Sequence, residues 1–247
     1  MKVLVIGETC VDKFVYCDAK RLSPEAPVPV LNPIKSVENP GMAGNTFANV
    51  KALSPEAIMA NITQKKKIIK TRYVEEKSNH MFLRVDKGEK FDDLFQWSMF
   101  VDSSIAEADI VIVSDYNKGF LSNSDLKEIA RKSTLSILDS KRKLTNDIIE
   151  NFTFVKLNES ERLNNLNLTT DNIITTLGKK GAEYKNILFE SPNPQDTIDV
   201  SGAGDTFTAA FIIKYYQLKN EEAAIKFANR KSSEVVSQRG VVTPEFE

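Results

Sequence analysis

The sequence has little cysteine, a single histidine and no excess of charge of either sign. Only Cys10 and Cys17 occur among 247 residues, which excludes a disulfide framework and leads us to expect a reducing, cytoplasmic location. His80 alone cannot form a histidine-rich zinc site, and a Ser-His-Asp triad would depend on it. Lys and Arg number 33, and Asp and Glu 34, so the net charge of −1 gives no overall field to attract nucleic acid or an anionic membrane.

Long apolar runs and the standard nucleotide motifs are also missing. Glu8 and Asp12 interrupt the apolar start of the chain before a signal-peptide core or a membrane span could form. The sequence has no G-x-x-x-x-G-K-[ST] motif, and Gly202 and Gly204 lack the third glycine of a dinucleotide fingerprint. The hydrophobic content of 41% suits a single globular domain over residues 1–247.

The most informative stretch is Asp199-Val200-Ser201-Gly202-Ala203-Gly204-Asp205, which leads into a predicted apolar helix from 203 to 218. A tight turn at a helix N-terminus presents free N–H groups and the positive end of the helix dipole to an anion. Gly202 and Gly204 would let an oxyanion approach the backbone closely. Asp205 adds a carboxylate that could accept a hydroxyl proton during phosphoryl transfer. The same residues also fit an ordinary loop with a helix cap.

Apolar runs alternate with helical patterns in the second half of the chain. Strands are predicted at 2–6, 109–113, 135–138, 153–157 and 172–177, and helices at 91–104, 122–132 and 221–236. Elements that alternate at this spacing form right-handed crossovers around a parallel sheet. We therefore predict an α/β fold with a doubly wound, mainly parallel sheet flanked by helices.

Two stretches depart from this pattern and predict a small β lid, from about 13–38 and 68–88. Three prolines between Arg21 and Val30 forbid a helix there, and the flanking residues alternate like edge strands. Residues 68–74 and 80–86 alternate around a polar turn, which indicates a hairpin carrying Arg72 and Arg84. Either arginine could grip a sugar phosphate, and both also fit an ordinary surface.

The stretch around Asp205 resembles the Asp-x-x-Gly-Ala-Gly-Asp signature of the ribokinase-like (PfkB) carbohydrate kinases. The resemblance implies a ribokinase-like fold, ATP and Mg²⁺ as cofactors, and Asp205 as the catalytic base beside the amides of Gly202, Ala203 and Gly204. Within the family, the segment from Arg21 to Val30 is similar to the lid of bacterial D-glycero-β-D-manno-heptose 7-phosphate kinases. The expected reaction is phosphorylation of that heptose at O1 to the 1,7-bisphosphate, a lipopolysaccharide precursor.

The resemblance also assigns residues to the two substrates. The residues expected to bind the sugar phosphate are Asp12, Gly41, Asn45, Arg84, Asp115, Lys118 and Asp199. Those expected to bind the nucleotide are Asn158, Glu161, Thr176, Gly178, Gly181, Ser201 and Asn229, and Glu161 would bind Mg²⁺ through water. Taken alone, Asn158 and Glu161 are equally a helix-capping pair.

Two features differ from the family pattern. Met42 stands where the family has a second glycine, and residues 54–70 hold only a short apolar run in place of a strand-helix-strand unit. Two alternatives stay open: another sugar kinase of the family, acting on ribose or fructose, and a nucleotide- or sugar-binding protein without turnover. K⁺ bound near Asp199 and a homodimer paired through the lid are further options. The kinase hypothesis requires a cavity that joins Asp205 to Asp12 and Asn45.

Overall fold

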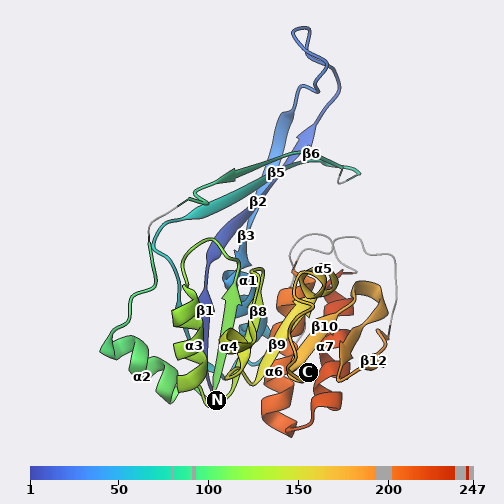
Figure 1. Cartoon of the computed structure of the whole chain (residues 1–247). Helices are drawn as coiled ribbons and strands as arrows, with labels where there is room; N and C mark the ends of the chain where they lie inside the picture. Colours follow the sequence, from blue (N-terminus) through green and yellow to red (C-terminus); the bar gives the residue numbers. More distant parts are fainter. Residues whose placement is uncertain (79, 91–92, 193–201, 237–242, 245–247) are drawn as a thin grey trace.

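A computed structural model describes residues 1–78, 80–90, 93–192, 202–236 and 243–244 of the chain. Its larger sheet has eight strands in the order β12-β11-β10-β9-β8-β7-β1-β4 (Figure 1). Six are parallel: β1 (Lys2–Gly7), β4 (Ile58–Ile62), β7 (Ile110–Asp115), β8 (Ser136–Ser140), β9 (Phe154–Asn158) and β10 (Ile173–Thr176). The short antiparallel strands β11 (Ala182–Tyr184) and β12 (Ile187–Phe189) complete one edge.

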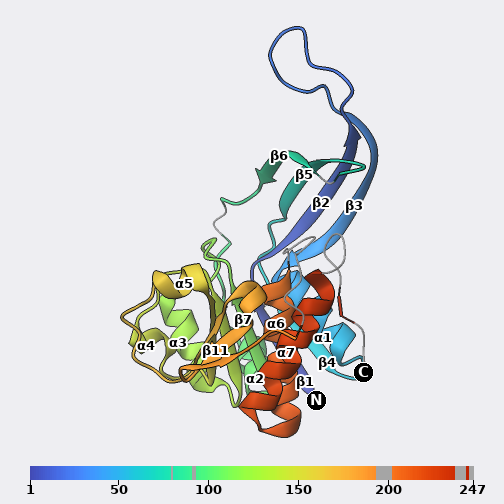
Figure 2. The same ribbon diagram turned by 90° about the vertical axis from the view of Figure 1, so that its right-hand side faces the viewer.

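Helices cover both faces of this central sheet (Figure 2). Val3 and Val5 of β1 belong to one core cluster, while Leu4 and Ile6 belong to the other. The first cluster is covered by α1 (Ala43–Leu53), α6 (Ala203–Leu218) and α7 (Glu221–Val236), and the second by α2 (Met99–Glu107), α3 (Asn123–Lys132) and α4 (Asn146–Ile149). Burial on both faces explains the continuous apolar runs of the strands, and the predicted doubly wound fold is confirmed.

A second sheet of four strands lies above the carboxyl edge of the central sheet (Figure 1). Its order is β3-β2-β5-β6, with β2 (Thr9–Asp18), β3 (Asn32–Met42), β5 (Ile68–Glu75) and β6 (Met81–Lys87). The predicted hairpin is the antiparallel pair β5 and β6. Only Glu8 separates β1 from β2, and β3 runs directly into α1, so this sheet is tied at both points to the central one.

Two local features refine the sequence reading. The helix predicted from residue 91 begins at Met99, because the Ser98 side chain accepts the N–H of Val101 and caps it there, and Phe91 lies outside the described residues. The short apolar run after α1 forms β4, the edge strand beside β1. None of the helices in the described ranges has the length and apolar character needed to cross a membrane.

Candidate active site

Two cavities meet at the N-terminus of α6. The larger, of about 610 Å³, is bordered by the segments that follow β8, β9 and β10 and by α6 and α7. The smaller, of about 350 Å³, lies between the second sheet and the carboxyl edge of the central sheet. Tyr116, Lys141, Gly202 and Asp205 line both cavities. Asp12 and Asn45 line the smaller cavity together with Asp205, as the kinase hypothesis requires.

Asp205 lies in the first turn of α6, and donors from two other elements hold its carboxylate. Its Oδ2 accepts a hydrogen bond of 2.8 Å from Asn45 Nδ2, and its Oδ1 accepts one of 3.1 Å from the Tyr116 hydroxyl. Burial and the nearby charge of Asp139 raise the pKa of Asp205 to about 6, although the bonds from Asn45 and Tyr116 lower it. The carboxylate is therefore ionised at neutral pH and still basic enough to accept a proton.

The turn into α6 has the backbone geometry that the predicted anion site requires. Gly202 precedes the helix with a φ of 87°, a left-handed conformation that glycine adopts without strain. Ala203 and Gly204 are the first two residues of the helix, so their N–H groups have no partner within it. A Cβ at Gly204 would lie 2.9 Å from Lys156 Nζ. Glycine at 204 therefore leaves room for a buried ammonium group beside the amides.

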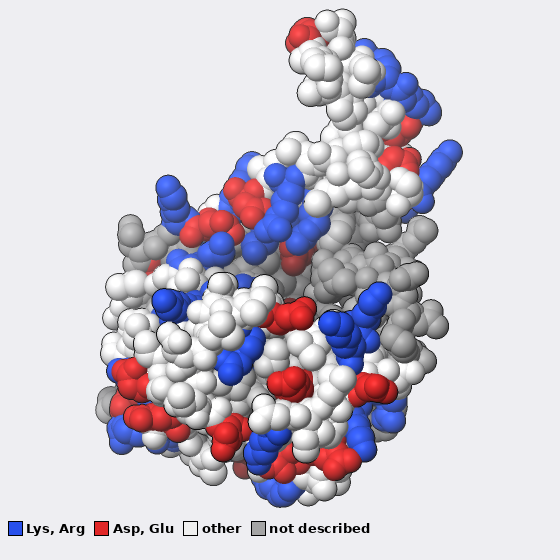
Figure 3. Space-filling model, turned by 45° about the vertical axis from the view of Figure 1, so that its right-hand side comes forward, with Lys and Arg blue, Asp and Glu red and all other residues white. Residues whose placement is uncertain are grey.

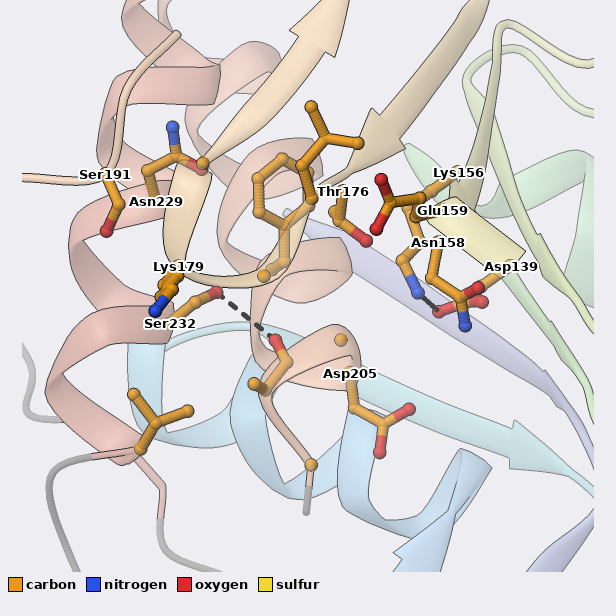
Figure 4. Close-up of a pocket in the computed structure, with 18 of the residues that line it drawn as sticks. Asp139, Lys156, Asn158, Glu159, Thr176, Lys179, Ser191, Asp205, Asn229 and Ser232 are labelled. Atoms are coloured by element: carbon orange, nitrogen blue, oxygen red, sulfur yellow. Dashed lines mark hydrogen bonds and ion pairs between the residues drawn. The ribbon is translucent and has the colours of Figure 1, made fainter. Parts of the chain in front are cut away.

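Lys156 and its partner Asp139 are functional candidates to which the sequence analysis assigned no role. Lys156 Nζ donates to Asp139 Oδ2 at 3.0 Å, and both residues line the larger cavity (Figure 4). Burial alone would lower the pKa of Lys156, but Asp139 and Glu161 raise it above its usual value. A positive charge thus stays beside the anion site. The signal in the sequence was a lysine between the apolar residues Val155 and Leu157 of strand β9.

Most of the predicted nucleotide residues line the larger cavity, with Asp205 at one end and Asn229 at the other (Figure 4). Those found there are Asn158, Thr176, Gly178, Gly181 and Asn229. The amide of Asn229 donates to the carbonyl of Phe189 at 2.8 Å, which fixes the wall of the cavity. Ser201 and Asp199 lie outside the described residues.

Glu161 is placed behind the cavity wall. It forms a capping box with Asn158 at the start of α5 (Glu159–Leu163), and Lys141 Nζ donates to its Oε1 at 3.1 Å. It does not line either cavity, whereas Glu159 lines the larger one. The described ranges hold no cluster of three or more His, Cys, Asp or Glu side chains suited to a metal ion. This donor set fits an Mg²⁺ ion carried mainly by phosphate oxygens and water.

Basic residues outnumber acidic ones in the lining of the smaller cavity. Figure 3 shows Lys and Arg side chains beside Asp and Glu side chains around the hollow below the second sheet. Five basic residues line the smaller cavity, against the two acidic residues Asp12 and Asp205: Lys70, Arg72, Arg84, Lys118 and Lys141. Asp12 accepts a hydrogen bond from Arg72, and Arg84 is held in a bidentate pair by Asp86 at 2.8 Å for each bond. These pairs fix the guanidinium groups, whose remaining N–H groups can bind an anion.

Asp115 has other surroundings than we expected, whereas Gly41 lines the smaller cavity. Asp115 is fully buried and lines neither cavity, because Arg142 binds both of its carboxylate oxygens, at 2.6 and 2.7 Å. Gly41 makes room for Asp12, since a Cβ there would overlap that carboxylate. Met42 has a φ of 59°, so the residue that replaces the family's glycine has the left-handed φ that glycine favours.

Comparisons with known proteins agree with this geometry. Residues 51–246 match the family model described as pfkB family carbohydrate kinase. The bifunctional proteins HldE of a Nitratiruptor species and of Helicobacter pylori (strain J99) are 26% and 28% identical to the chain over its whole length. The chain spans only 63% and 65% of the length of these two relatives.

Solved structures of similar fold include two ribokinases. The enzyme of Thermotoga maritima has a TM-score of 0.72 and 17% identity, with 97% of this chain and 94% of that chain covered. The Arabidopsis thaliana ribokinase, complexed with ribose and ATP, has a TM-score of 0.71 and 15% identity, with 98% and 95% covered. At these identities the likeness concerns the fold.

Proposed function

Since the chain belongs to the pfkB family of carbohydrate kinases, which transfer phosphate to an alcohol, we propose that its acceptor is D-glycero-β-D-manno-heptose 7-phosphate, phosphorylated at O1 with Mg-ATP as donor. The observation that carries the proposal is the position of Asp205. Its carboxylate lies where a cavity rich in cations meets a larger cavity at a helix N-terminus. A sugar phosphate in the first and ATP in the second would meet at this base.

The residues around Asp205 supply the steps of the transfer. Asp205 takes the proton of the attacking hydroxyl, while Asn45 and Tyr116 keep its carboxylate aimed at the smaller cavity. The N–H groups at the start of α6 and the ammonium group of Lys156 face the transferring phosphoryl group. Fixed donors of this kind stabilise the charge that spreads over the phosphoryl oxygens.

Mg²⁺ would accompany the nucleotide. Asn158 and Glu159 at the start of α5 would hold it, with Glu161, which lines neither cavity, acting through water. When bound, such an ion neutralises negative charge on the phosphates. We further propose that K⁺ binds near Asp199, and that the second sheet acts as the lid over the acceptor.

The basic residues of the smaller cavity favour an anionic acceptor. A neutral sugar such as ribose needs hydrogen bonds to its hydroxyl groups, and Asp12 and Asn45 can supply these. It has no use for the four basic residues Lys70, Arg72, Arg84 and Lys118, which line the same cavity. The phosphate group that a sugar phosphate acceptor already carries would bind these basic residues. The resemblance of the segment from Arg21 to Val30 to the lid of heptose 7-phosphate kinases is the reason for choosing this heptose, and the similarity to the HldE proteins over the whole chain agrees with it.

A coupled assay of ADP release tests the proposal. The purified full chain would be offered heptose 7-phosphate, ribose, fructose and fructose 6-phosphate, with Mg²⁺ and with or without K⁺. We expect the highest kcat/KM for heptose 7-phosphate, and loss of turnover in Asp205→Asn. Faster turnover of ribose or fructose would overturn the heptose assignment. Stabilisation by ATP without turnover of any acceptor would mean a binding protein, and the proposed function would be wrong.

A further inference from the structure

We propose that Glu8 is a positioning residue for phosphoryl transfer, because it fixes both of the elements that present hydrogen-bond donors to Asp205. The inference rests on the proposed function. Glu8 is the single residue between β1 and β2, at the point where the chain leaves the central sheet for the second sheet. It is fully buried and lines neither cavity, so it cannot touch a substrate.

The side chain of Glu8 holds the loop that follows β7. Its Oε2 accepts the N–H of Tyr116 at 2.8 Å, and its Oε1 accepts those of Lys118 and Phe120 at 2.9 and 3.3 Å. Three N–H groups of an irregular loop are thus satisfied by one carboxylate. This loop carries the Tyr116 hydroxyl to Asp205 and the Lys118 ammonium to the smaller cavity.

The main chain of Glu8 holds the start of α1. Its carbonyl oxygen accepts the N–H of Ala43, the first residue of that helix, at 2.9 Å. The helix has no side-chain cap, because Met42 occupies the capping position. Glu8 therefore satisfies a donor that would otherwise be unpaired at a buried helix start. Two residues further along, Asn45 donates to Asp205.

The two arrangements converge on the two oxygens of one carboxylate. Asp205 Oδ2 depends on Asn45, on the helix whose start the main chain of Glu8 holds. Asp205 Oδ1 accepts from Tyr116 at 3.1 Å, in the loop that the side chain of Glu8 holds, and also from the Thr46 hydroxyl of α1 at 3.4 Å. Displacement of either donor would rotate the base away from the hydroxyl that it must deprotonate. An error of about 1 Å at a reacting group costs on the order of 100-fold in rate.

A glutamine cannot replace this carboxylate fully. Burial and the charge of Asp115 raise the pKa of Glu8, so the ionised carboxylate is costly at this position. The N–H groups of Tyr116, Lys118 and Phe120 offset part of this cost. The side chain of Glu8→Gln has the same size and keeps one oxygen, which can serve Lys118 and Phe120. Its amino group faces the N–H of Tyr116 and cannot accept it. The substitution should therefore release Tyr116 selectively.

Steady-state kinetics and hydrogen exchange of the full chain test the proposal. We expect Glu8→Gln to lower kcat about 10- to 100-fold with little change in the KM for ATP, and to speed amide exchange in residues 114–121. Glu8→Asp, which keeps two accepting oxygens, should restore part of kcat. The matched control is Asp109→Asn, because Asp109 accepts the N–H of Lys2 at 2.7 Å at the opposite end of β1, and its kcat should equal that of wild type.

Further outcomes separate this inference from the proposed function. Combined with Tyr116→Phe, Glu8→Gln should cost less than the product of the two separate losses, because both act through one contact; independent losses would overturn the inference. Faster exchange with unchanged kcat would also overturn it. Unchanged exchange in residues 114–121 would show that the carboxylate does not hold the loop.

Two remaining outcomes concern the wild type and the folding of the variant. Absence of turnover in the wild type would refute the proposed function, and the positioning role with it, whereas the exchange result would still test the contacts of Glu8. If Glu8→Gln does not fold, Glu8→Asp takes its place, and faster amide exchange in residues 114–121 with an unchanged kcat in that variant would overturn the inference.

Discussion

The most direct test of the site is the stability of Asp205→Asn as a function of pH. The folded protein raises the pKa of Asp205 from its ordinary value of 3.8 to about 6. A carboxyl group with a raised pKa stabilises the fold fully below its unfolded pKa and loses that contribution as the pH rises through its folded pKa. At 1.36 kcal/mol per pKa unit, the loss for Asp205 amounts to roughly 3 kcal/mol.

Asparagine does not titrate, so the variant avoids this loss. We expect the free energy of unfolding of Asp205→Asn, minus that of wild type, to increase by up to about 3 kcal/mol between about pH 4 and pH 7. Above about pH 7 the difference should be constant. At every pH in this range, the kcat of Asp205→Asn should be on the order of 10²- to 10⁴-fold below that of wild type, because the base is missing. As the pH rises, the variant would thus gain stability relative to wild type although it lacks the catalytic base.

Urea unfolding of both proteins without ligands, at closely spaced pH values, measures this difference. Asp147→Asn is the control with the opposite sign, because Lys127 and Thr145 hold the pKa of Asp147 low and its contribution is lost as the pH falls. A flat or decreasing difference for Asp205→Asn would refute the reasoning that Asp205 is a buried base. Retained turnover would show that another group accepts the proton.

Three further predictions concern the groups around the base. Tyr116→Phe removes a donor that lowers the pKa of Asp205, so the acid limb of kcat/KM, near pH 6 in wild type, should move to higher pH; an unmoved limb would contradict the contact. Lys156→Met leaves the carboxylate of Asp139 buried without its ammonium partner, so the free energy of unfolding measured in urea should fall by about 3–5 kcal/mol. Adding Asp139→Asn should recover most of this loss, and equal stability of the single and double variants would contradict the pair. Arg84→Ala should raise the KM for the phosphorylated acceptor about 10- to 100-fold and leave the KM for ATP unchanged. Arg131→Ala, at an exposed position, is the control. An equal rise in the two KM values would argue against a phosphate site at Arg84.

Much of the fold could be read from the chain because the signals are local. The bounds of α6 and α7 are those predicted, because helical periodicity and the residues near the helix ends are signals that lie within the helix itself. The cap at Ser122 and the capping pair of Asn158 and Glu161 were also visible as short patterns. The start of α2 was predicted too early, because the helical spacing of apolar residues already begins on the N-terminal side of the true cap at Ser98.

The site could be predicted only in part. Asp205, Asn45 and Asp12 were identified because their motif spacing matches that of the family, and they border one cavity. Asp115 lies in the same kind of motif but is held by Arg142, which is 27 residues away in sequence. Lys156 looked like one residue of an apolar strand until Asp139, on the neighbouring strand, appeared beside it. Partners at such separations leave no pattern in a single chain.

The sequence by itself determined the order of strands and helices, the turn into α6 and the carboxylate that follows it. These depend on residues a few positions apart, whose interactions are the same in any fold. Only the tertiary structure decided which donors reach that carboxylate, which cations border the acceptor cavity, and that Glu8 holds both supports of the base. These contacts join residues as much as 160 positions apart, so their free energies exist only once the two sheets and their helices have packed together.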